Sequence, residues 1–246
     1  MWTRAMLKEN AKYSMQRNYW YCIAALMGFM AIAGSTSRIG GLYYNITALP
    51  QMMAAETGYF TGGNAPDSAY VAAMVAGMMG AVMIFMGLTM LVKIFLVNPI
   101  QVGLRKFFIM NRTSVRTDVS YLVYPLKRGY GNVVKGMFLT HLFLMFWYAL
   151  CIVPGIIKGF SYMLVPYILA DNPDMDAMDA INLSKKMMDG HKAEAFVLGL
   201  SFIGWFILSY FTCGILLYFY VIPYMCATYA EFYTAIKENY VPIPEL

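Results

Sequence analysis

The sequence predicts an all-α protein: a polytopic helical membrane bundle with six transmembrane helices, cytoplasmic interfacial amphipathic helices and an internal hairpin repeat. Of its 246 residues, 60% are hydrophobic and only 13% are charged, whereas a soluble domain carries about 25% charged residues. Several apolar stretches reach the length of about 18 residues that a spanning helix needs, and none shows the short alternating strands of a membrane barrel. We therefore expect an integral membrane protein.

Residues 1–18 predict an amphipathic helix that lies on the cytoplasmic surface of the membrane. Arg4, Lys8 and Lys12 form a basic stripe at four-residue spacing. The other side of this helix carries Trp2, Met6 and Tyr13. A helix of this kind lies among the headgroups of an anionic leaflet, so anionic lipid headgroups are the expected partner.

A single six-span membrane domain is expected to fill residues 19–246. Its first two spans are residues 19–33 and 69–97, and an outer loop, residues 34–68, connects them. Residues 98–135 are polar, and against Asp118 they carry the basic residues Arg105, Lys106, Arg112, Arg116, Lys127, Arg128 and Lys135. The positive-inside rule makes this segment cytoplasmic, together with both termini.

The apolar run over residues 136–170 contains one lysine, Lys158. As a single helix this run would be about 52 Å long, far more than a hydrocarbon core of about 30 Å. Pro154 and Gly155 predict a turn, because proline removes a backbone donor and glycine tolerates the turn. Lys158 then lies at the outer interface, where it reaches water. A role for Lys158 in transport or in binding a lipid headgroup is the alternative.

A second hairpin is predicted over residues 195–230, with its break at Thr212, Cys213 and Gly214. The charged segment between the hairpins, residues 171–194, is then cytoplasmic. Two repeat units, 131–170 and 190–227, match at a separation of 57 to 59 residues, and the paired motifs are Gly155-Ile156 with Gly214-Ile215 and Pro166-Tyr167 with Pro223-Tyr224. Such a repeat, with both units entering from one side, is a known way to build membrane bundles.

The two repeat prolines, Pro166 and Pro223, each predict a kink in a helix that returns to the cytoplasm. Each proline deprives the carbonyl one turn earlier of its amide donor. Those carbonyls belong to Tyr162 and Phe219. In hydrocarbon such a carbonyl needs another donor, so we expect polar groups near both kinks.

Asn98-Pro99 and Asp171-Asn172-Pro173 predict the starts of two further cytoplasmic amphipathic helices, with asparagine as N-cap and proline at the first helical position. The first helix places Ile100, Leu104, Phe107 and Phe108 on one face, opposite Arg105 and Arg112. The second places Ala177, Ile181, Ser184 and Met188 on one face, and Gly190 is its expected C-cap.

Motifs along nearly the whole chain resemble a bacterial integral membrane protein family called domain of unknown function 975. The most specific are Asn98-Pro99, Val102-Gly103, Phe107-Phe108, Pro154-Gly155-Ile156-Ile157, Asp171-Asn172-Pro173, Ser184-Lys185, Gly190-His191-Lys192, Leu200-Ser201-Phe202-Ile203-Gly204-Trp205 and Pro223-Tyr224. The hairpin unit is also loosely similar to Yip1-like membrane proteins and to the membrane domain beside some glycerophosphodiester phosphodiesterases. The resemblance implies the helical fold and a bacterial cytoplasmic membrane location, and it implies no chemistry.

Four aspartates in residues 171–179 form the string that most resembles a Mg²⁺ site for a lipid phosphate. A second aspartate-rich motif is missing, so helix capping is the favoured interpretation. No catalytic residue, metal ligand or cofactor is predicted. The candidate polar or lipid site is instead a cluster near the inner leaflet: His141, Lys93, Lys192 and Glu194.

The leading functional hypothesis is a non-enzymatic plasma-membrane scaffold that organises lipid or binds a partner protein, without nucleic acid. The basic cytoplasmic face supports it, as does a ridge of small residues, Ala73, Gly77 and Ala81, suited to contact with another helix or a second copy of the chain. The alternative is a transporter or channel for a small solute or a lipid. The repeat, the two prolines and His141 support that alternative.

Overall fold

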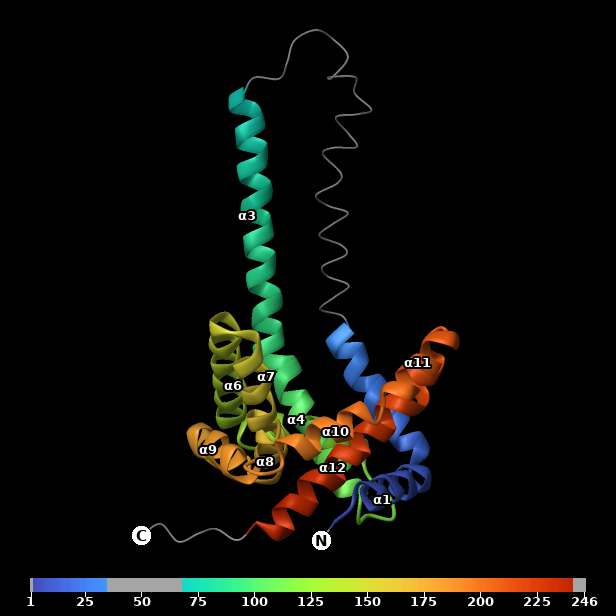
Figure 1. The fold of residues 1–246 in the computed structure, drawn as a ribbon. Helices are drawn as coiled ribbons and strands as arrows, with labels where there is room; N and C mark the ends of the chain where they lie inside the picture. The colour runs from blue at the N-terminus through green and yellow to red at the C-terminus, as the bar shows by residue number, and fades with distance from the viewer. Residues whose placement is uncertain (1, 35–67, 241–246) are drawn as a thin grey trace, which may run out of the picture. The chain divides into compact units, whose positions relative to one another are not determined.

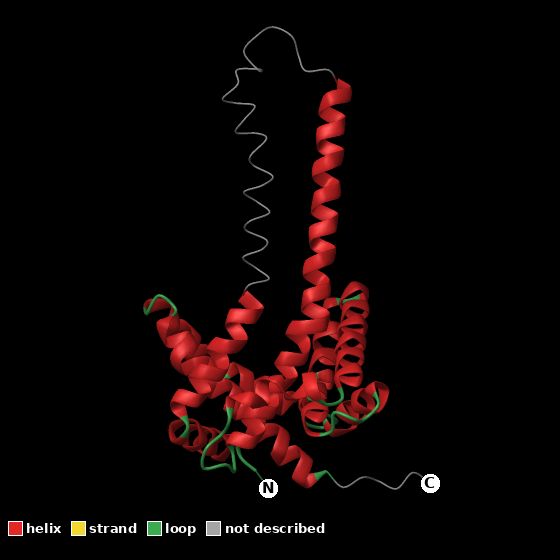
Figure 2. Cartoon of the chain, turned by 180° about the vertical axis from the view of Figure 1, so that it is seen from behind, coloured by secondary structure: helices red, strands yellow, loops and turns green. Residues whose placement is uncertain are grey.

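The computed structural model describes residues 2–34 and 68–240, and within them every regular element is helical (Figure 2). The predicted outer loop lies outside the described residues except at its two ends. Four helical segments are long and apolar enough to cross a membrane: Met79–Asn111, Tyr130–Leu150, Ile152–Asp171 and Lys192–Phe211. The helix Tyr19–Gly34 is apolar and shorter. The all-α class is therefore confirmed, four segments qualify as candidate spans by length and composition, and the count of six spans stays a prediction.

The chain divides into two compact units. One unit, Met30–Val97, contains α3 (Ser68–Val92) and the π-helix η1 (Lys93–Val97). The other combines Met1–Phe29 with Asn98–Leu246. Every contact described below lies within this second unit.

The Asn98-Pro99 motif predicted that a helix starts at Asn98, but the chain is already helical before this residue. Instead η1 leads directly into α4 (Asn98–Asn111). Proline has no amide to donate, and the wider π turn before it accommodates the missing hydrogen bond. The residues of the predicted apolar face of α4 are all buried: Ile100, Leu104, Phe107 and Phe108.

Two short helices follow α4 and close against it. The 3₁₀ helix η2 (Val119–Val123) packs on α4, and α5 (Tyr124–Lys127) continues from it. Gly103 makes this contact close, because a Cβ on it would lie 2.0 Å from the backbone oxygen of Leu122. Gly129, with φ of 67°, then turns the chain into the next helix.

The first predicted hairpin is present, and its helices α6 (Tyr130–Leu150) and α7 (Ile152–Tyr162) run side by side (Figure 1). The turn lies at Cys151, whose backbone is extended, three residues before the predicted position at Pro154. Pro154 occupies the first turn of α7, where a missing amide costs nothing. A Cβ on Gly155 would lie 2.5 Å from the ring of Tyr148, so this glycine permits the close approach of the two helices.

The second hairpin comprises α10 (Lys192–Leu200), α11 (Ile203–Phe211), the π-helix η3 (Leu217–Val221) and α12 (Ile222–Asn239). Its turn is where the sequence predicts it. Cys213 and Gly214 have positive φ values of 51° and 82°. The amide of Gly214 donates to the carbonyl of Ser209 at 2.9 Å, which closes the end of α11.

Both repeat prolines coincide with interruptions of a helix, as predicted. Pro166 lies in the first turn of α8 (Val165–Asp171), which follows α7 after a break. Pro223 lies in the first turn of α12, directly after η3. That the two hairpins are copies of one unit stays a prediction.

Hydroxyl groups from other helices donate to carbonyls beside both prolines. The hydroxyl of Tyr19 donates to the carbonyl of Phe219 at 3.0 Å, which supplies the donor that the sequence required there. Ser184 on α9 (Ala177–Met187) donates to the carbonyl of Ser161 at 2.8 Å, one residue before the expected Tyr162. At Phe219 the interrupted helix thus obtains a hydrogen bond that its own backbone cannot make.

The N-terminal helix α1 (Arg4–Arg17) packs along α12. It buries Leu7, Ala11, Ser14 and Met15. Of the residues that the sequence placed on the side opposite the basic stripe, Met6 and Tyr13 are exposed, whereas Trp2 packs edge-on against Phe232 of α12. The face that packs on α12 thus includes the small residues Ala11 and Ser14, and the membrane-surface position of the helix stays a prediction.

The helix α9 (Ala177–Met187) packs against α6 and α7 (Figure 1). The sequence predicted that Asn172 starts this helix, but Asn172 is instead the C-cap of α8. Asp176 is the N-cap: its side chain accepts from the amide of Met178 at 3.0 Å. That amide, together with Lys135, holds the pKa of Asp176 below its usual range.

The residues predicted to share one face of α9 are all buried: Ala177, Ile181, Ser184 and Met188. Gly190 lies beyond the helix, with φ of 81°, rather than at its C-cap, which is Met188.

Candidate functional site

The structure does not bring together His141, Lys192 and Glu194, three members of the predicted polar cluster. Each group instead contacts a neighbour within about one helical turn: His141 Nδ1 lies 2.7 Å from the Met137 carbonyl, Glu194 Oε2 lies 2.7 Å from His191 Nδ1, and Lys192 Nζ lies 3.6 Å from Asp189 Oδ1. The fourth member, Lys93, belongs to η1 in the other unit.

One lysine of the predicted basic stripe contacts protein. Lys8 Nζ lies 3.4 Å from the carbonyl of Ser201, the C-cap of α10, and 4.7 Å from the centre of the Phe202 ring. Partial burial and the nearby Arg4 lower the pKa of Lys8. Arg4 and Lys12 are exposed, and the role in lipid binding that the sequence proposed for the stripe stays a prediction.

Asp171, at the end of α8, joins three helices. Its carboxylate lies 3.3 Å from Lys106 Nζ on α4 and 2.6 Å from Lys237 Nζ on α12, and the hydroxyl of Tyr233 donates to it at 3.1 Å. The Asp171 side chain is only 11% exposed. We call these four residues the Asp171 hub. The sequence singled out Asp171 as part of a helix-start motif and missed its partners, which lie far away along the chain.

Two of the three other aspartates in residues 171–179 also have structural roles. Asp174 lies 3.3 Å from Arg128 and Asp176 lies 3.1 Å from Lys135. Capping is thus confirmed for Asp176, and the ion pairs show that part of the basic excess of residues 98–135 is neutralised within the protein. Among the described residues, no three His, Cys, Asp or Glu side chains gather closely enough to hold a metal ion.

Arg105 turns into the protein, although the sequence placed it on the polar face of α4. Its guanidinium lies 3.7 Å from the sulfur of Cys226 and 5.1 Å from the centre of the Tyr167 ring. A guanidinium is weakly hydrated and stacks well on aromatic rings, which makes it the cation that tolerates such a place best.

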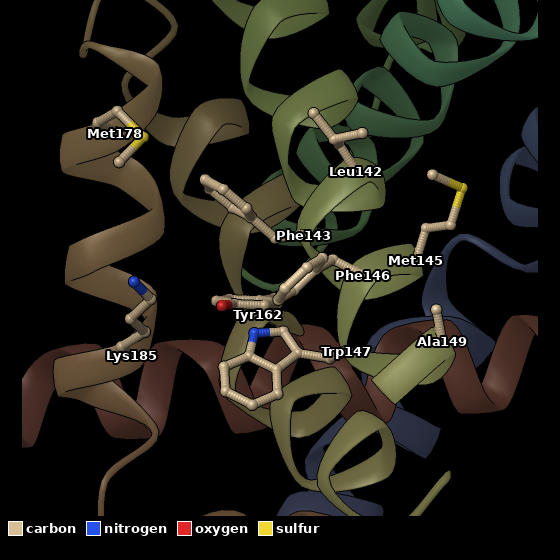
Figure 3. A pocket seen from close by; sticks show the side chains of 9 residues that line it. All are labelled: Leu142, Phe143, Met145, Phe146, Trp147, Ala149, Tyr162, Met178 and Lys185. Atoms are coloured by element: carbon tan, nitrogen blue, oxygen red, sulfur yellow. The ribbon is translucent and has the colours of Figure 1, made fainter. Parts of the chain in front are cut away.

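An apolar groove opens between α6 and α9, with a volume of about 730 Å³. Its lining residues are Leu142, Phe143, Met145, Phe146, Trp147, Ala149, Tyr162, Met178 and Lys185. We call it the Lys185 groove. Figure 3 shows Met178 and Lys185 on one side, α6 on the other, and the rings of Phe143, Tyr162 and Trp147 between them. Its volume lies in the range of about 300–1,000 Å³ that is usual for small-molecule sites.

Two ammonium groups lie against the aromatic wall of the groove. Lys185 Nζ lies 5.6 Å from the centre of the Tyr162 ring and 3.2 Å from Asn182 Oδ1. Lys158 Nζ lies 4.9 Å from the centre of the Trp147 ring. Neither lysine has a carboxylate partner among the residues that the structure describes. The groove therefore combines apolar walls with positive charge that nothing in this part of the chain neutralises.

Residues 69–240 match the model of a family described as protein of unknown function (DUF975). The chain belongs to the DUF975 family. No curated protein and no solved structure matches it. The Asp171 hub and the Lys185 groove fall entirely within the DUF975 region, whereas α1 precedes it.

The sequence of this DUF975 protein contained a signal for the groove that was not used. Met178 and Lys185 are seven residues apart, and so are Leu142 and Ala149, which puts each pair on one side of its helix. That these two sides face each other depends on the path of α9 across the hairpin, and local periodicity contains no information about that path.

Proposed function

We propose that this DUF975 protein is a non-enzymatic scaffold of the bacterial cytoplasmic membrane that binds and organises lipid. In this proposal six spans cross the membrane, both termini are cytoplasmic, and α1, α4 and α9 lie at the cytoplasmic side. The observation that carries it is the Lys185 groove, where exposed apolar walls meet cationic side chains that have no carboxylate partner in the described part of the chain.

Exposed apolar side chains on both hairpins support a lipid environment. At the turn between α6 and α7, Leu150, Ile152 and Val153 are 63%, 71% and 67% exposed. On the other hairpin, Tyr210 and Phe211 are 84% and 76% exposed. Large continuous apolar surfaces mark membrane or protein contacts, and aromatic residues prefer the membrane–water interface.

Buried ion pairs support a fixed base beneath these hairpins. The Asp171 hub joins α4, α8 and α12. In a second contact, Arg112 Nε lies 2.9 Å from Glu231 Oε2, and Glu231 is only 4% exposed. A base held by such contacts presents a constant surface to lipid, which is what a scaffold requires.

Lipid analysis of protein extracted from membranes tests this proposal. Polymer nanodiscs that contain the protein should be enriched severalfold in anionic lipid over nanodiscs of an unrelated multi-pass protein of similar length from the same cells. Replacing the exposed Arg4 and Lys12 with glutamine should reduce the enrichment, since each basic residue near an anionic surface contributes about 1 kcal/mol.

Measurements of solute leakage and lipid translocation in reconstituted vesicles can contradict the same proposal. The scaffold should leave solute leakage and lipid translocation at the level of protein-free vesicles. Absence of anionic enrichment combined with protein-dependent flux would instead establish the transporter or channel alternative.

A further inference from the structure

We propose that the Lys185 groove is a binding site for one anionic phospholipid, with an acyl chain against α6 and the phosphate at Lys185. This inference rests on the proposed lipid-binding function and assigns it to a particular site.

The walls of the groove fit an acyl chain. Apart from Lys185 and the hydroxyl of Tyr162, the lining side chains are apolar. Leu142, Met145, Phe146 and Ala149 follow one side of α6, and the eight residues from Leu142 to Ala149 span about 10 Å of helix. A flexible chain can lie along this side and bury its methylene groups, each worth about 0.8 kcal/mol.

The charge of the groove selects the headgroup. Lys185 holds its ammonium beside Tyr162 and Asn182, and Lys158, which does not line the groove, lies over the Trp147 ring. No lining residue carries a carboxylate. A phosphate with no cationic substituent satisfies the Lys185 ammonium, whereas the ammonium group of a zwitterionic lipid finds no carboxylate in the groove. The apolar walls, in turn, favour a lipid over free phosphate.

The fold places the charge and the chain at suitable positions. The ion pair of Lys135 with Asp176 fixes the start of α9 beside the first turns of α6, and Ser184 fixes α9 to α7. Lys185 follows Ser184 directly, so its position along the hairpin is determined by a buried hydrogen bond. In the proposed topology this is the cytoplasmic interface, where a lipid of the inner leaflet carries its phosphate.

Fluorescence of Trp147 tests the site directly, because this ring lines the groove. The full chain, with Trp2, Trp20 and Trp205 replaced by phenylalanine, is reconstituted in vesicles that contain brominated phosphatidylglycerol or brominated phosphatidylcholine. The anionic brominated lipid should quench Trp147 at lower mole fractions than the zwitterionic one. Lys185→Gln should reduce this preference about fivefold, as expected for the loss of one lysine near a phosphate.

Lys186→Gln is the matched control. It makes the same change of charge one residue away, at a position that is exposed and does not line the groove. The preference for phosphatidylglycerol should persist in this variant. Thermal unfolding of each variant verifies that it is folded.

Three results would overturn the inference. Equal quenching by the two lipids would show ordinary boundary lipid, and lack of quenching by either would show that protein covers the groove. An unchanged preference in Lys185→Gln would place the anionic lipid elsewhere on the protein. This last result leaves the proposed function intact, because enrichment of anionic lipid in nanodiscs does not depend on which site binds it.

Discussion

Replacing Asp171 with asparagine should destabilise the protein by about 3 kcal/mol or more, as breaking a buried ion pair does. The carboxylate is shared by Lys106 and Lys237, and its side chain is 11% exposed. Its removal leaves Lys106, at 15% exposure, without a counter-charge in a place where water solvates it poorly. Because α4, α8 and α12 meet at this carboxylate, the loss should appear as a lower temperature of thermal unfolding in nanodiscs.

Asp174→Asn is the matched control for Asp171→Asn. Asp174 is three residues away and is also ion-paired, with Arg128, but the two side chains are 67% and 66% exposed. An exposed pair of this kind contributes at most about 1 kcal/mol. Equal effects of the two substitutions would show that Asp171 is not a structural hub.

Gly103→Ala should have a comparably large effect through a steric clash. The added Cβ would lie 2.0 Å from the oxygen, 2.6 Å from the carbonyl carbon and 2.9 Å from the Cα of Leu122. All three are backbone atoms, so no change of rotamer relieves the contact, and η2 must move away from α4. Overpacking typically costs about 1–3 kcal/mol, and a clash with backbone lies at the upper end of that range.

Gly131→Ala provides the comparison for Gly103→Ala. A Cβ on Gly131 meets nothing within 4 Å. Alanine favours a helix over glycine by up to about 1 kcal/mol, so thermal stability should be unchanged or raised. A protein that tolerates alanine equally at both positions would contradict the close packing of α4 on η2.

Local chemistry predicted the positions of the helices and most of their ends. Apolar runs gave the helices, positive φ at Cys213 and Gly214 occurs where the sequence suggested a turn, and both Pro166 and Pro223 interrupt a helix. These features depend on residues close together in the chain. The asparagine–proline motifs were exceptions, because at Asn98 the helix continues through a π turn and at Asn172 it ends. The first turn, found at Cys151, and the end of α9, found at Met188, were also misplaced by a few residues.

The contacts that form the candidate site could not be predicted in the same way. Asp171 and Lys237 form an ion pair although they are far apart in sequence, and the residues around either one do not indicate its partner. Arg105 belongs, by its position in the sequence, to the polar face of α4, yet its side chain packs inward on Tyr167. Burial against a distant helix overrode local amphipathicity at Arg105, just as the packing of α1 on α12 left Tyr13 exposed.

The most direct measurement is the side of the membrane on which each hairpin turn lies. The protein supplies its own reporters: Cys151 and Cys213 lie at the two turns and are exposed, whereas Cys22 and Cys226 are buried. The 21 residues of α6 span about 31 Å, enough to cross a hydrocarbon core of about 30 Å. Variants that retain only one of the exposed cysteines can be treated with a membrane-impermeant maleimide on intact cells.

The lipid-organising scaffold proposed here predicts that Cys151 and Cys213 are each labelled in intact cells. Asp179→Cys, in a chain without those two cysteines, should be labelled only after the membrane is permeabilised. Labelling of the two turns only after permeabilisation, together with Asp179→Cys, would show that both hairpins stay on the cytoplasmic side and would contradict the proposed membrane-spanning arrangement.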